Sequence, residues 1–206
     1  MTILNVWVAR DSVTVAVDTS TVSDDGTYIG ESSKLIPLVH ANALIASRGH
    51  MQFLTVIFEG AHWQPHDLDS LVDGMPMLFP QCLSQIKNLS EQKGLPSKVS
   101  FDRQCIVLAG WSSKLDRPAA WYYLQEDAQT ELQVSEITSY IISPGTDDIP
   151  RRLHVPADSA GILALATEQR RKLNELQPGS ARGGLVVAQI TRNQMKIQRL
   201  ALDATG

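Results

Sequence analysis

The stretch that decides the fold is MTILNVWVARDSVTVAVD, residues 1–18. Residues 2–9 are an apolar run of the kind that forms a buried strand. Residues 12–18 alternate instead, with a valine at every second position, which is typical of a strand that faces the core on one side. Two strands separated by Arg10-Asp11 predict a β-hairpin at the start of the chain.

The register of this hairpin decides which residues meet at its open end. If Ala9 pairs with Ser12 beside the turn, Thr2 pairs with Thr19 at the other end. Asp18 then lies next to the N-terminus. Because the two turn residues are not a strong type I′ sequence, a register shifted by one residue stays open.

Thr2 directly follows the initiator methionine. A small second residue normally allows an aminopeptidase to remove Met1, so we expect a chain that begins with Thr2. Its α-amine would have an ordinary pKa of about 7.7–8 and would be partly neutral at physiological pH. A threonine hydroxyl activated by its own terminal amine is a known pairing of nucleophile and base.

The composition is that of an ordinary globular protein. The chain has 206 residues, of which 43% are hydrophobic and 19% charged, and we expect a single domain spanning residues 1–206. The formal net charge of −4, without clustered Lys and Arg, argues against nucleic acid as a partner. No apolar run is long enough to span a membrane.

The cysteines and histidines do not indicate a metal site. Cys82 and Cys105 lie far apart in apolar surroundings, which predicts buried thiols in a reducing compartment, most simply the cytoplasm. The five histidines lack ligand spacing, and no glycine-rich phosphate loop follows a strand. We therefore expect neither a metal nor another cofactor.

The order of the elements predicts an α+β domain with helices packed outside antiparallel sheets. After the first hairpin and a polar loop over residues 20–30, we expect helices at 50–61, 67–93 and 158–176. The remaining strands are expected at 33–38, 43–46, 105–109, 120–124, 131–134, 139–142, 185–191 and 195–200.

Three residue types suited to hydrolysis stand together in this scheme. Thr2 would be the nucleophile, and an ammonium at Lys34 would stabilise its developing alkoxide. Asp18 would pair with Lys34 and keep it charged and oriented. A backbone N–H near Gly49 would donate to the oxyanion, because glycine permits close approach of a substrate carbonyl.

This part of the chain resembles the proteasome β-type, or HslV-like, family of N-terminal-nucleophile hydrolases. The likeness rests on Val15-Ala16-Val17-Asp18, on Ser33-Lys34-Leu35-Ile36-Pro37-Leu38 and on the turn from Ala46 to Gly49. It is specific over residues 2–50 and covers the rest as an order of strands and helices. The direct Met1-Thr2 start looks more like the bacterial HslV and betaproteobacterial proteasome homologue branches.

The resemblance implies an α+β fold of the four-layer αββα sandwich type and a self-compartmentalising threonine endopeptidase. It further implies a homo-oligomeric double ring of hexamers or heptamers, whose substrate is an unfolded polypeptide. An AAA+ unfoldase would be the partner where folded proteins are degraded. No cofactor belongs to this chemistry.

The remaining site residues are carried over from the family. Its Gly-Ser-Gly turn corresponds to Ser143-Pro144-Gly145, so Ser143 is the candidate assisting hydroxyl. A later Asp and Ser of the family have no clear match near Ser180. Substrate would lie as a strand against Ser20, Thr21 and Val22, and the side-chain pocket would be shaped by Ser32, Ile36, Ala46 and His50.

Two other functions stay open at this point. The chain could be an inactive homologue that forms rings and only binds. The imperfect match to the family's Ser and Asp positions, at Ser143 and near Ser180, suggests this alternative. It could also be an N-terminal-nucleophile amidase acting on a small amide, for which an enclosed chamber would serve no purpose.

Overall fold

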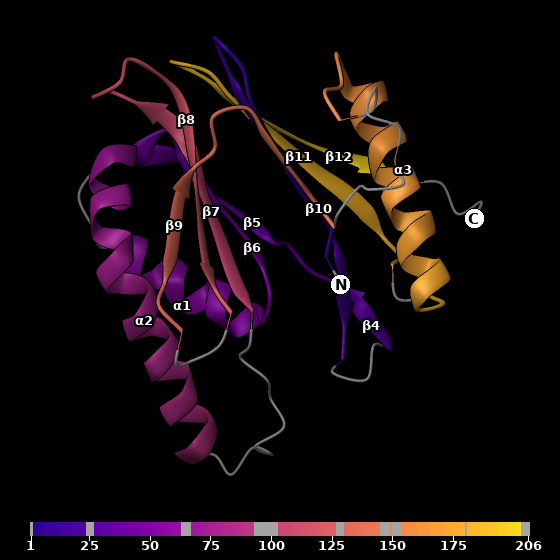
Figure 1. Cartoon of the computed structure of the whole chain (residues 1–206), viewed down its shortest axis with the longest axis horizontal. Coiled ribbons are helices and arrows are strands. Elements are labelled where there is room, and N and C mark those ends of the chain that lie inside the picture. Colours follow the sequence, from indigo (N-terminus) through magenta and orange to yellow (C-terminus); the bar gives the residue numbers. More distant parts are fainter. Residues whose placement is uncertain are drawn as a thin grey trace.

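The computed structural model describes residues 2–23, 27–62, 67–92, 103–126, 130–144, 149, 154–179 and 181–202. Met1 and Ser180 therefore lie outside the described residues. In the described part the fold is mixed α/β, with three α-helices, one short 3-10 helix (Val39–Ala41) and three β-sheets (Figure 1).

The first sheet is built around the N-terminal hairpin. Its strand order is β10-β1-β2-β11-β12 and every pair is antiparallel. Its strands are β1 (Leu4–Val8), β2 (Val13–Asp18), β10 (Tyr140–Ser143), β11 (Gly184–Ile190) and β12 (Met195–Ala201). Leu4 lies opposite Val17, and the Ala9 N–H donates to the Ser12 carbonyl at 2.9 Å. The register predicted for the hairpin is confirmed.

The second sheet has the order β5-β6-β7-β8-β9 and is also antiparallel. It comprises β5 (Leu35–Leu38), β6 (Ala43–Arg48), β7 (Gln104–Ser112), β8 (Arg117–Gln125) and β9 (Gln133–Glu136). β7 and β8 run several residues longer than the sequence predicted. They pair right up to the turn at residues 113–116, where Asp116 adopts a positive φ of 48°.

The prediction of a loop over residues 20–30 was wrong in part. Ser20–Val22 forms β3 and Tyr28–Glu31 forms β4, which together make a two-stranded sheet. The pairing is irregular between Thr21 and Val22. Because both strands are only three or four residues long, neither is long enough to show the hydrophobic alternation that identifies a strand from sequence.

The helices lie close to their predicted positions. They are α1 (Met51–His62), α2 (Leu68–Gln92) and α3 (Ser159–Leu176). The Asp67 and Asp158 carboxylates accept the backbone N–H groups of Ser70 and Gly161, each at 2.8 Å, so both predicted N-caps are confirmed. None of the described helices is long and apolar enough to cross a lipid bilayer.

Three hydrophobic clusters stack these elements together. The first joins α1 and α2 to one face of the second sheet, through residues such as Phe53, Phe79 and Ile106. The second lies between the two sheets and includes Val15 and Val107. The third joins the outer face of the first sheet to α3 and includes Trp7, Ala16, Leu165 and Leu185. Figure 1 accordingly shows α1 and α2 on one side of the sheets and α3 on the other.

We predict that Phe79→Ala lowers the free energy of unfolding by about 3–5 kcal/mol, because it leaves a cavity in the first cluster. The rings of Phe53 and Phe79 pack edge to face with centroids 4.7 Å apart, and both side chains are buried. Urea denaturation followed by circular dichroism measures the change. Val39→Ala, at a site that is 76% exposed, is the control and should change the value by less than about 0.5 kcal/mol. Equal effects of the two substitutions would contradict this packing.

Candidate active site

Three segments that are separate in the sequence bring polar side chains together at one buried point. Thr2 precedes β1, Asp18 ends β2, and Lys34 immediately precedes β5. Their exposed fractions are only 8%, 2% and 5%. The hairpin returns Asp18 to the N-terminus, and the pairing of β5 with β6 anchors Lys34, whose carbonyl accepts the Ser47 N–H at 2.9 Å. The structure therefore brings Thr2, Asp18 and Lys34 together.

The Lys34 ammonium is coordinated by three oxygens. Its Nζ lies 3.0 Å and 3.1 Å from the two carboxylate oxygens of Asp18 and 3.1 Å from Thr2 Oγ1. A charged lysine has three N–H donors, so each donor has one acceptor here. The arrangement places a positive charge directly beside the threonine hydroxyl.

Asp18 is fixed by the backbone as well as by Lys34. Its Oδ1 accepts the Ile3 N–H at 2.9 Å and its Oδ2 accepts the Ser20 N–H at 3.1 Å. Together with the two bonds from Lys34 these fill the lone-pair directions of a carboxylate. Asp18 therefore ties the residue after Thr2 to the start of β3 and holds Lys34 in a single orientation.

Burial and Asp18 act on the charge of Lys34 in opposite directions. Burial is the larger effect and lowers the pKa of Lys34 below its ordinary value of 10.5, while the adjacent Asp18 carboxylate raises it. A lysine with a lowered pKa beside a hydroxyl is typical of sites where a proton or a developing negative charge is handled.

Neither of the two cysteines is suited to act as a nucleophile. Cys82 and Cys105 are both free and buried, and burial raises the pKa of each thiol to about 11. Because the thiolate is the reactive form, both are poorly reactive at neutral pH.

Gly49 follows β6 in a conformation that favours glycine. Its φ is +134°, and a Cβ at this position would clash with the side-chain oxygen of Gln104. The same Gln104 oxygen accepts the His50 N–H at 2.8 Å. The need for glycine at this turn thus has a structural cause, namely the buried Gln104 side chain. Its proposed role as an oxyanion donor stays a prediction.

Ser143 ends β10, where it pairs with Leu4, the second residue after Thr2. Its backbone N–H donates to Asn5 Oδ1 at 3.2 Å, and its hydroxyl oxygen accepts a hydrogen bond from Arg48 Nη1. Since Arg48 occupies an acceptor position, the hydroxyl hydrogen of Ser143 is left to donate elsewhere.

The residues predicted to bind the substrate strand, Ser20, Thr21 and Val22, form β3. The Ser20 hydroxyl donates to the Arg182 carbonyl and accepts the Arg182 N–H at 2.7 Å, so this side chain has a structural role. Thr21 Oγ1 lies 2.5 Å from Ser32 Oγ, which also contacts Met51 Sδ at 3.5 Å. Val22 pairs with Tyr28 of β4. Of the predicted binding residues, Thr21 and Ser32 are in contact.

The structure does not bring all the predicted pocket residues to one surface. Ile36 packs against the cluster under α1 and α2, whereas Ala46 belongs to the cluster between the sheets. The two side chains therefore face opposite sides of the second sheet, because successive residues of a strand alternate. His50 sits directly before α1, where its ring Nδ1 accepts the Gln52 N–H at 3.3 Å.

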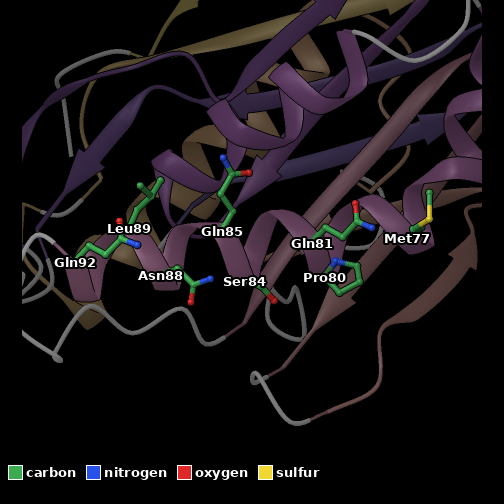
Figure 2. A pocket seen from close by; sticks show the side chains of 8 residues that line it. All are labelled: Met77, Pro80, Gln81, Ser84, Gln85, Asn88, Leu89 and Gln92. Carbon is green, nitrogen blue, oxygen red and sulfur yellow. The ribbon is translucent and has the colours of Figure 1, made fainter.

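A large surface groove lies away from these residues. It has a volume of about 710 Å³ and follows the outer face of α2, where Figure 2 shows its side chains along the helix. They are uncharged: Met77, Pro80, Gln81, Ser84, Gln85, Asn88, Leu89 and Gln92. None belongs to the cluster around Thr2. Within the described ranges, no group of three His, Cys, Asp or Glu residues is arranged to hold a metal ion.

Several residues at the site were missed from the sequence. Arg48, Asn5 and Gln104 all contact predicted site residues, yet each stands alone in the sequence without a motif. A polar residue inside the otherwise apolar run of β1 was the one available signal for Asn5.

A scan against models of known protein families and a search of curated proteins found no match to this chain.

We predict that the stabilising contribution of Lys34 rises with pH. Its folded-state pKa is lowered, so between that value and 10.5 the unfolded chain binds more protons at this position than the folded chain. Urea denaturation of the wild type and of Lys34→Met, between about pH 8 and 10, measures the difference in unfolding free energy. The free energy of unfolding of the wild type should rise relative to that of Lys34→Met as pH rises. A difference between the two proteins that shrinks with pH would contradict the lowered pKa.

Proposed function

We propose that this protein is a threonine endopeptidase of the N-terminal-nucleophile class, with Thr2 as the nucleophile. The observation that carries the proposal is the buried trio in which Lys34 Nζ lies 3.1 Å from Thr2 Oγ1 and 3.0 Å from Asp18. A buried ammonium beside a hydroxyl stabilises the alkoxide that forms when the hydroxyl attacks.

The base in this proposal is the α-amine of Thr2, which becomes free when the bond to Met1 is cleaved. Among the described residues, no histidine or carboxylate hydrogen-bonds to the Thr2 hydroxyl, whose partner is Lys34. The three N–H groups of Lys34 are directed at Asp18 and Thr2, which suits an electrostatic role better than that of a base. A terminal amine is the arrangement that then completes a threonine nucleophile.

Catalysis would proceed through an ester intermediate. The α-amine takes the proton of Thr2 Oγ, and Oγ attacks the peptide carbonyl carbon, while Lys34 stabilises the developing charge. The protonated amine gives its proton to the leaving nitrogen, and the C–N bond breaks to leave an acyl-Thr2 ester. Water, deprotonated by the same amine, then hydrolyses the ester and restores the hydroxyl. Gly49 is the proposed source of a backbone donor to the oxyanion.

We further propose that substrate binds as an extended strand beside β3. Within the described chain β3 pairs on one side only, with β4, and a peptide added at its other edge would gain main-chain hydrogen bonds. Main-chain hydrogen bonds depend little on the side chains of the substrate, so this binding mode suits an unfolded polypeptide of any sequence. Thr21, Ser32 and Met51 would contribute to the first side-chain pocket.

The stacking of helices, sheet, sheet and helix supports a four-layer αββα sandwich of the N-terminal-nucleophile type. By the same family resemblance we propose a double ring of hexamers or heptamers that works with an AAA+ unfoldase. We also propose that the protein works in the cytoplasm, which the buried free thiols of Cys82 and Cys105 support.

We predict that Thr2→Ala lowers the rate of cleavage of an unfolded protein or a fluorogenic peptide by at least about 10³-fold. Thr2→Ser keeps a hydroxyl and should retain measurable turnover. Thr55→Ala, an exposed threonine on α1, is the matched control and should behave as the wild type. Full activity of Thr2→Ala would refute the proposal. Turnover confined to small amides by a monomeric species would instead assign an amidase, and no turnover by the wild type would favour an inactive binding homologue.

We predict that Lys34→Met lowers kcat by about 10²–10³-fold with little change in KM, because the ammonium acts on the charge that develops at Thr2 Oγ. Steady-state kinetics on one peptide substrate gives both constants. Lys114→Met, at an exposed lysine in the turn between β7 and β8, controls for the loss of a positive charge. A raised KM with unchanged kcat would show that Lys34 only binds substrate.

A further inference from the structure

Two amide side chains are buried together between the first sheet and α3. Asn5 of β1 and Gln169 of α3 are 164 residues apart in sequence, and both are 0% exposed. Asn5 Nδ2 donates to Gln169 Oε1 at 2.7 Å, and Gln169 Nε2 donates back to Asn5 Oδ1 at 3.0 Å. The pair is thus reciprocal and closed off from water.

The pair also holds the backbone at the end of β10. The Ser143 N–H donates to Asn5 Oδ1 at 3.2 Å, and Gln169 Nε2 lies 3.5 Å from the Pro144 carbonyl. On its other side, Ser143 is held through its hydroxyl by Arg48. Because Ser143 lies opposite Leu4, the segment fixed in this way runs beside the residues that follow Thr2.

Packing alone does not explain these amides. On the same face of the N-terminal strand as Asn5, Ile3 and Trp7 are buried apolar residues, and around Gln169 the buried face of α3 is apolar. Burying an amide has a desolvation cost that its hydrogen bonds only offset. Replacing both partners by apolar groups of similar shape is often nearly neutral for stability. The amides therefore supply something that a leucine and a methionine would not, namely hydrogen bonds to the backbone of Ser143 and Pro144.

We propose that Asn5 and Gln169 are positioning residues, which hold Ser143 and Pro144 in register with the N-terminus and so make α3 part of the support of the active site. The inference rests on the proposed function, since it concerns the geometry around Thr2. A displacement of about 1 Å at a catalytic centre can lower the rate by about 10²-fold. Loosening this segment should therefore act on the rate of the chemical step.

The test is the double variant N5L/Q169M, assayed as the full chain for unfolding midpoint, kcat and KM on one peptide. We expect a modestly lowered unfolding midpoint, because the Ser143 N–H loses its acceptor, together with a KM within about twofold and a kcat lowered by about 10- to 100-fold. The control is Gln125→Met, the same substitution at a buried glutamine of β8 that bonds to the Thr130 carbonyl, and its kcat should match the wild type.

A folded N5L/Q169M protein with wild-type kcat would overturn the inference. Where the double variant does not fold, Gln169→Met is compared with Gln125→Met at equal folded fraction, and equal kcat values overturn it as well. Thr2→Ala is measured alongside. If Thr2→Ala is fully active, the proposed function fails, whereas an inactive Thr2→Ala with an unaffected N5L/Q169M protein removes only this inference.

Discussion

The contact on which the rest of the site depends is the buried ion pair between Lys34 and Asp18. Lys34 is 5% exposed and Asp18 is 2% exposed, so neither charge is hydrated to any useful extent. Taking two charges out of water costs about as much as, or more than, their attraction returns, and a buried pair is therefore weak support for stability. Its value lies in where it places the ammonium, 3.1 Å from Thr2 Oγ1.

The hairpin of β1 and β2 makes this pair possible. Its register brings Asp18 beside Ile3, whose N–H the carboxylate accepts at 2.9 Å, while Lys34 reaches the same carboxylate from the start of the second sheet. The site thus lies where the two sheets meet. A shift of the register by one residue would turn Asp18 to the opposite face, because side chains alternate along a strand. The position of Thr2 is consequently set by the pairing of β1 with β2.

Much of this arrangement could be predicted from the sequence, and what could not has physical causes. The valine alternation in β2 defines the hairpin, and the capping residues Asp67 and Asp158 define two helix starts. β3 and β4 carry no hydrophobic pattern, so they were expected to be a loop. The contacts of Asn5 with Gln169, and of Arg48 with Ser143, join residues far apart in sequence, and no local pattern encodes such pairs.

The central claim is that the Thr2 hydroxyl attacks the substrate and that the free α-amine of Thr2 acts as its base. The most direct measurement is the intact mass of the purified protein before and after treatment with a peptide epoxyketone, with the modified N-terminal peptide then sequenced by mass spectrometry. The account predicts a chain that lacks Met1 and gains one inhibitor, attached to Thr2 through both the hydroxyl and the amine. Retention of Met1 in a protein that cleaves peptides, or attachment of the inhibitor to another residue, would contradict it.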